Sequence, residues 1–156
     1  MAEQPAEIIR SKVSVYEIEL DLSDWSAKLS NEVPNFASLL LDLLPSLKEH
    51  NCMAGKPGGF CQELQNGTNF AHVIEHIILE LIHLADAEKE YYTGWTRQLD
   101  KRDVYIVHYG APDFLTGRLA VILGIDLVKR VMKGETLSVD HYIQLLKQPH
   151  SYFTEG

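Results

Sequence analysis

The chain has 156 residues, enough to bury one core, and its hydrophobic share of 46% and charged share of 23% are those of an ordinary globular domain. It holds neither an apolar run long enough to span a membrane nor a charged-then-apolar leader, so we expect a cytoplasmic protein with no membrane partner. The net charge of -8 argues against nucleic acid as a partner and suits a cationic ligand.

The first half of the chain is predicted to form a strand and two helices. Residues 13–22 alternate between apolar and acidic side chains, which is typical of a half-exposed strand. The elements expected after it are a helix over 34–44 that Pro45 disturbs and a glycine-rich loop over 55–59. A turn over 66–68 then comes before an N-cap and the central helix, which ends near Glu88.

The second half is predicted to form a hairpin and two helices. The expected elements are strands over 91–99 and 104–109 with a polar turn over 100–103, a helix from Pro112 to Gly134, and a short helix from Ser138 to Leu146. The ends, 1–11 and 148–156, are expected to be flexible. This order predicts a single domain over 1–156 of the α+β class, in which helices pack on one face of a small antiparallel sheet.

The helix around 70–84 carries the candidate chemistry. Its sequence is almost wholly apolar, which predicts a helix buried on most sides. At about 100° per residue, the polar exceptions fall within an arc of roughly 140°. They are His72, Glu75, His76, Glu80 and His83. A buried polar stripe is unfavourable unless its groups are paired or bind something.

His72 and His76 lie one turn apart and can hold one Zn²⁺, and Glu75 between them completes the pattern H-x-x-E-H, in which the glutamate activates water. The alternative is a buried helix whose histidines bond to carbonyls or carboxylates. We favour Glu80 as the third ligand, because it extends the histidine face of an apolar helix, where an unpaired carboxylate would be costly to bury. Glu80 continues the row, but its Cα lies about 12 Å along the axis from that of His72. Other candidates for this ligand are Cys52, Cys61, His83 and His108.

Three residues outside this helix are candidates for substrate binding. Gly58 and Gly59 can form a wall of the site, because glycine lets a backbone approach a ligand, or they can belong to an ordinary loop. Arg97, near the end of a predicted strand, can clamp a carboxylate with two hydrogen bonds or can be solvated.

Residues 51–81 resemble the N-terminal domain of cyanophycin synthetases, in which a Cys, a Gly-Gly-Phe loop, a Gly-Thr turn and H-V-I-E-H followed by Leu-Glu-Leu occur in this order. The similarity covers most of the chain. It implies His72 and His76 as metal ligands, Glu75 as the base, and Glu80 as a third ligand or an orienting carboxylate, and it favours Arg97 as a clamp. It also implies a fold like that of the metallohydrolases related to mitochondrial processing peptidase.

The full-length enzymes of that family add domains that join Asp and Arg into a polymer, but this chain holds no G-x-x-x-x-G-K-[ST] motif, so we do not expect ATP-dependent synthesis. The leading hypothesis is a zinc-dependent hydrolase of peptide or isopeptide bonds in a β-Asp-Arg polymer or its fragments. The first alternative is a non-catalytic module that binds the polymer, and the second is a metallo-lyase for a small metabolite. The oligomeric state is open, with a homodimer as one option.

Overall fold

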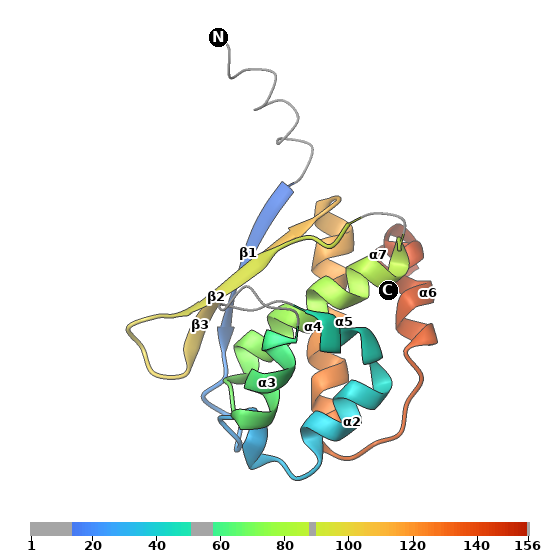
Figure 1. The fold of residues 1–156 in the computed structure, drawn as a ribbon. Coiled ribbons are helices and arrows are strands. Elements are labelled where there is room, and N and C mark those ends of the chain that lie inside the picture. Colours follow the sequence, from blue (N-terminus) through green and yellow to red (C-terminus); the bar gives the residue numbers. More distant parts are fainter. Residues whose placement is uncertain (1–13, 51–57, 88–89, 156) are drawn as a thin grey trace, which may run out of the picture.

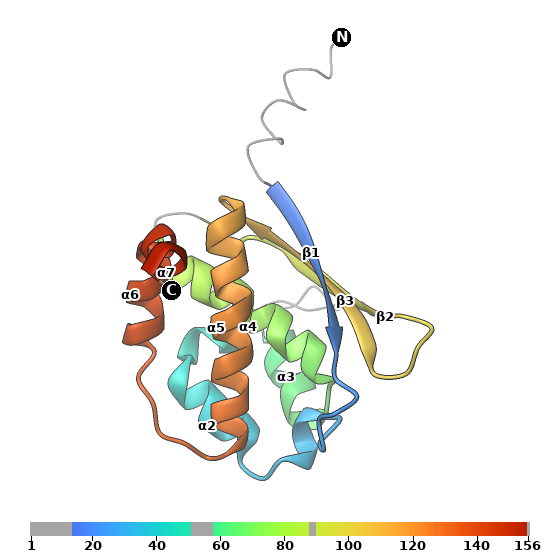
Figure 2. The same cartoon turned by 180° about the vertical axis from the view of Figure 1, so that it is seen from behind.

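The computed structural model describes residues 14–50, 58–87 and 90–155, which form one three-stranded antiparallel sheet with helices packed on one of its faces. Figures 1 and 2 show the helices gathered on the same side of the sheet from opposite views. The α+β class is therefore confirmed, while the likeness to the mitochondrial-processing-peptidase fold stays a prediction.

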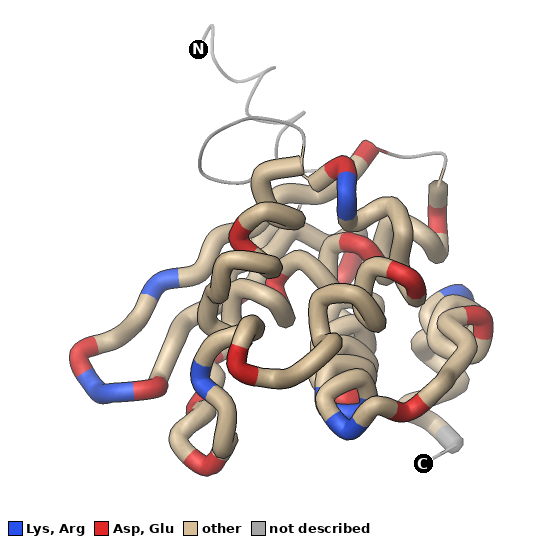
Figure 3. Tube along the Cα trace, turned by 60° about the horizontal axis from the view of Figure 1, so that its bottom comes forward, with Lys and Arg blue, Asp and Glu red and all other residues tan. Residues whose placement is uncertain are grey.

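The sheet consists of β1 (Ser14–Asp21), β2 (Gly94–Gln98) and β3 (Val104–Ala111), in the order β1-β3-β2. Tyr16 pairs with Tyr109, and both Ile18 and Thr96 pair with Val107, so these side chains share the face that the helices cover. β2 is shorter than the predicted strand over 91–99. The predicted polar turn joins it to β3, and Figure 3 shows residues of both signs side by side there.

The helices of the described residues surround the central helix α4. The α-helices are α2 (Phe36–Leu43), α3 (Gly59–Asn66), α4 (Phe70–Ala85), α5 (Phe114–Met132), α6 (Asp140–Lys147) and α7 (Pro149–Glu155), and 3-10 helices lie at η1 (Ser30–Glu32) and η2 (Pro45–Glu49). α4 contacts β2 and β3 as well as α5 and α6, and twelve of its sixteen residues are buried. This confirms the prediction of a helix buried on most sides. None of the described helices is long and apolar enough to cross a membrane.

The N-cap expected directly after the turn over 66–68 is confirmed, whereas the start of α5 differs from the prediction. Asn69 caps α4, because its side-chain oxygen accepts the backbone N–H of His72 at 2.8 Å. In the same way Asp113 caps α5 by accepting the backbone N–H of Thr116 at 2.8 Å, so this helix begins after Pro112.

Two α-helices of the described residues were not predicted. α3 is short and mixed in polarity, and it begins after Gly58, whose φ of 86° lies in the left-handed region. α7 lies in the tail for which the sequence predicts flexibility. Whether that tail moves in solution stays a prediction.

Candidate metal centre

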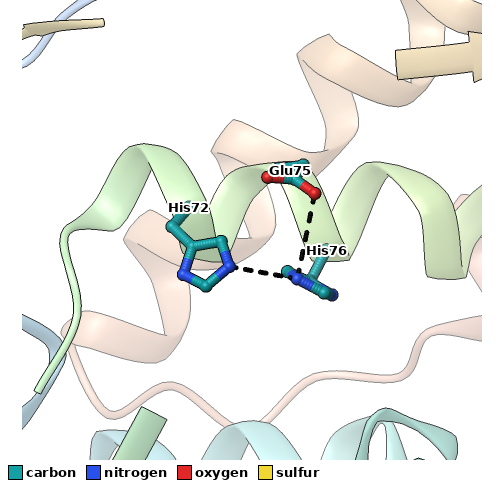
Figure 4. A group of neighbouring side chains, drawn as sticks. All are labelled: His72, Glu75 and His76. Atoms are coloured by element: carbon teal, nitrogen blue, oxygen red, sulfur yellow. Dashed lines mark hydrogen bonds and ion pairs between the residues drawn. The ribbon is translucent and has the colours of Figure 1, made fainter. Parts of the chain in front are cut away.

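The side chains of His72, Glu75 and His76 converge on one side of α4 (Figure 4). Their ligand atoms all lie within 4.8 Å of one another. The two histidine Nε2 atoms are 3.2 Å apart, and Glu75 Oε2 is 3.8 Å from His76 Nε2. Residues three and four apart face the same side of a helix, so this convergence follows from the spacing in the sequence.

This donor set fits zinc. Two imidazoles and a carboxylate are a common catalytic zinc set, and zinc–nitrogen bonds of about 2.0–2.1 Å place tetrahedral donors about 3.3 Å apart. The 3.2 Å between the two Nε2 atoms matches that spacing, and the 3.8 Å to Glu75 is slightly longer. His72 and His76 are therefore the residues that would hold the ion. Glu75 is within reach as either a ligand or a base.

Residues of other elements hold each member of the cluster in place. Thr68 Oγ1 lies 2.9 Å from the Nδ1 atom of His72, and Thr96 on β2 donates its hydroxyl to Glu75 Oε1 at 2.7 Å. Phe60 of α3 stacks flat on the ring of His76, with centroids 4.0 Å apart. The unpredicted helix α3 is thus one wall of the site.

Gly94 lets β2 come close to α4. A Cβ added at this position would meet the carbonyl oxygen of His108 and would lie 3.3 Å from Glu75 Cγ. A larger residue here would first push β2 away from β3, which carries that carbonyl, and would also crowd Glu75 of α4. Gly94 is a positioning residue that the sequence analysis missed.

Burial shifts the pKa values of the cluster. It raises the pKa of Glu75 from 4.5 to about 7, although the hydrogen bond from Thr96 acts in the opposite direction. It lowers the pKa of His76 to about 2, with further lowering by the neighbouring histidines His72 and His50. Burial also lowers the pKa of His72, against the attraction of Glu63. Neutral imidazoles are the form that binds metals, and a carboxylate with a pKa near 7 suits a general base.

Glu80 lies behind the cluster rather than in it. Its Oε1 atom accepts the hydroxyl of Tyr91 at 2.9 Å and lies 2.8 Å from His50 Nε2. His50 Nδ1 is in turn 2.9 Å from His76 Nδ1. Of the two roles that the resemblance implies for Glu80, this arrangement favours the orienting carboxylate. Direct ligation by Glu80 stays a prediction.

The other residues weighed as ligands lie apart from the cluster. Cys61 is half-buried on α3. His83 stacks on Tyr91 with centroids 3.8 Å apart, and His108 stacks on Trp95 at 4.3 Å. Cys52 lies outside the described residues.

The predicted substrate-binding residues do not line the pocket next to the cluster. Arg97 is exposed on β2 and, next in sequence to Thr96, points to the opposite face of the sheet. Gly58 begins α3, and Gly59 is buried within it. Their roles stay predictions.

The cluster lies at a pocket of about 600 Å³. Besides the cluster, its lining includes the carboxylates Glu49 and Glu63 and the aromatic residues Tyr91, Tyr92 and Trp95. No lysine or arginine occurs among the described residues that line it. The pocket is therefore suited to a positively charged group.

His50 is a second residue of the site that the sequence analysis missed. It follows η2 and is 26 residues from His76 in the chain, although the two rings are in hydrogen-bond contact. A single histidine after a short helix carries no spacing signal, so only the folded chain reveals its partners.

The fold and the cluster define a small α+β domain with a candidate metal site on its central helix. The chain belongs to the cyanophycin synthase-like N-terminal domain family, whose profile matches residues 17–133. This confirms the resemblance that the motifs of residues 51–81 indicate.

The relatives are much longer proteins. The chain is 36% identical over 129 residues to the cyanophycin synthetase of Crocosphaera subtropica. This alignment covers 83% of this chain and 14% of the relative. It is 38% identical over 125 residues to that of Synechocystis sp., with 80% of this chain and 14% of the relative covered. The relatives are named for synthesis, so hydrolysis by this domain stays a prediction.

Proposed function

We propose that the chain is a zinc-dependent hydrolase of peptide or isopeptide bonds in a β-Asp-Arg polymer or its fragments. The observation that carries the proposal is the convergence of His72, Glu75 and His76 at an acidic pocket. Structural histidines of a buried helix need only satisfied hydrogen bonds. Here the groups have such hydrogen bonds, and in addition two ring nitrogens and a carboxylate approach one another at metal-ligand spacing.

The residues of the site divide the work. His72 and His76 hold the ion, and zinc, when bound, supplies Lewis acidity that polarises the scissile carbonyl and acidifies water. Glu75 takes the proton of the attacking water and passes it to the leaving amine. Thr96 keeps Glu75 in place during both transfers, because its hydroxyl bonds to the oxygen Oε1 that points away from His76.

The charge of the pocket supports an arginine-containing substrate. Glu49 and Glu63, which come from η2 and α3, both line it. A guanidinium group pairs with carboxylates through two parallel hydrogen bonds. The names of the relatives add the polymer of Asp and Arg as the natural candidate. Arg97, on the other face of β2, has no part in this mechanism.

A module that binds the polymer without cutting it is the second candidate. The aromatic residues Tyr91, Tyr92 and Trp95 beside the carboxylates could hold arginine side chains by stacking and charge alone. Such a role requires no metal. Nothing in the described part of the pocket favours the metabolite lyase. The cytoplasmic location also stays a prediction.

The test combines metal analysis with one substitution. We expect the purified protein to contain about one zinc per chain and to lose it to a chelator. Glu75→Gln should keep the zinc while hydrolysis of β-Asp-Arg substrates falls by more than about 100-fold, the effect typical of a lost general base. Glu17→Gln is the matched control, since Glu17 is exposed on β1, and it should change neither quantity.

The outcomes separate the candidates. Failure to take up zinc would overturn the metal site. Zinc uptake and polymer binding by a wild-type protein that hydrolyses nothing would favour the binding module. Equal activity of wild type and Glu75→Gln would show that Glu75 is not the base.

A further inference from the structure

A buried chain of hydrogen bonds connects the pocket to the interior behind it. It runs from Glu80 Oε1 to His50 Nε2 at 2.8 Å, from His50 Nδ1 to His76 Nδ1 at 2.9 Å, and from His76 Nε2 to His72 Nε2 at 3.2 Å. The exposed fractions are 1% for Glu80, 7% for His50 and 5% for His76. Because water hardly reaches these side chains, each ring nitrogen must find its partner within the chain of bonds.

The direction of this chain follows from its inner end. Glu80 Oε1 accepts the hydroxyl proton of Tyr91, so this oxygen is an acceptor and the nitrogen of His50 that contacts it must donate. A neutral imidazole has one donor and one acceptor. Nδ1 of His50 therefore accepts, and Nδ1 of His76 donates to it. The proton of His76 is then on Nδ1, and Nε2 presents its lone pair to the pocket.

The neighbouring rings hold this arrangement in place. Tyr91 packs its edge against His50, with centroids 5.0 Å apart and planes at 79°, and lies flat on His83. Phe60 lies flat on His76, with planes at 17°. Neither imidazole can turn over without displacing an aromatic ring, so the order of donors and acceptors is also an order of fixed ring orientations.

We propose that His50 is a positioning residue which, backed by Glu80 and Tyr91, keeps the proton of His76 on Nδ1, so that the lone pair of Nε2 faces His72 and the pocket, where a ligand can accept it. The competing arrangement has a doubly protonated His50 that donates to Nδ1 of His76. The proton of His76 would then be on Nε2 and would face His72. Only the effect of His50 on zinc affinity rests on the proposed function, because the tautomer exists without metal.

The first test is the tautomer of His76 in the metal-free wild-type protein. Proton–nitrogen correlation spectra of protein labelled with ¹⁵N in histidine distinguish a protonated ring nitrogen from an unprotonated one. We expect His76 to be protonated on Nδ1 and unprotonated on Nε2, and His50 to be protonated on Nε2. A proton on Nε2 of His76 would overturn the proposal. This measurement needs no variant and no bound metal.

The second test compares two replacements of His50. In His50→Gln the amide oxygen can still accept from Nδ1 of His76, whereas His50→Leu offers no acceptor. We expect His50→Leu to weaken zinc binding by about 10- to 100-fold, the loss typical of groups that orient a metal ligand, and to move part of the His76 proton to Nε2. His50→Gln should stay within a few-fold of wild type in affinity and keep the wild-type tautomer. His141→Leu, at an exposed position of α6, is the control.

The two tests keep this proposal apart from the zinc hydrolase. Equal losses of zinc affinity in His50→Gln and His50→Leu would show that His50 acts only through packing, and this result would overturn the positioning role. If wild type shows the expected tautomer but binds no zinc, the metal site is wrong and the positioning role stands. If His50→Leu does not fold, the wild-type spectrum decides alone.

Discussion

Replacing Glu75 by Gln should stabilise the metal-free protein at pH 8 but hardly at pH 4. Glu75 is 4% exposed, and its burial raises its pKa from 4.5 to about 7. The folded protein therefore binds this proton more strongly than the unfolded chain does. The wild-type protein has its full stability from this group below pH 4.5, and it loses that stability as the pH rises to about 7.

The magnitude follows from the pKa difference. At about 1.4 kcal/mol for each pH unit, a pKa raised from 4.5 to about 7 lowers the free energy of unfolding by about 3 kcal/mol above pH 7. Gln does not titrate, and its amide oxygen can still accept the hydroxyl of Thr96. The stability of Glu75→Gln relative to wild type should therefore rise by about 3 kcal/mol between pH 4 and pH 8.

Urea unfolding in the presence of a chelator measures this difference. The lowered pKa of His76 also makes stability depend on pH, but both proteins share that effect, so it cancels in the comparison. Glu17→Gln, at an exposed position, should show no such rise. Zinc should reduce the difference in stability between Glu75→Gln and wild type at pH 8, because a cation beside Glu75 favours the ionised carboxylate. If the free energies of unfolding of Glu75→Gln and wild type differ by the same amount at pH 4 and pH 8, the reasoning is refuted.

Three further predictions test the site. Thr96→Val removes the donor to Glu75 and should lower the free energy of unfolding by about 1–3 kcal/mol at pH 8 and by less at pH 4. An equal loss of stability at the two pH values would assign the effect to packing. Glu63→Gln should raise the KM for an arginine-containing substrate about 10-fold, whereas Arg97→Gln should change this KM less than about twofold. A larger KM increase for Arg97→Gln than for Glu63→Gln would restore Arg97 as the clamp. Phe60→Ala should lower the free energy of unfolding by about 3–5 kcal/mol, since the ring is fully buried. Phe60→Leu should lower it by clearly less. Equal losses of stability in the two variants would mean that the stacking of the ring, not its volume, matters.

The elements that the sequence analysis predicted well are those with a strong local pattern. β1 follows from alternation, β3 follows from a short apolar run beside a polar turn, and α4 and α5 follow from long apolar periodicity. The helix α3 was missed because it is short and begins at a glycine, with few large apolar residues. The start of α5 was misplaced by two residues, since the side chain of Asp113 caps the helix after Pro112.

The sequence alone determined the cluster of His72, Glu75 and His76, because a helix places residues three and four apart on one side whatever surrounds it. Only the tertiary structure decided what surrounds the cluster. His50 reaches His76 across 26 residues, and Glu75 meets Thr96 across 21. Contacts at such separations depend on how strands and helices pack, and no local spacing encodes them. Packing likewise turned Glu80 towards His50 and placed Arg97 on the far face of β2.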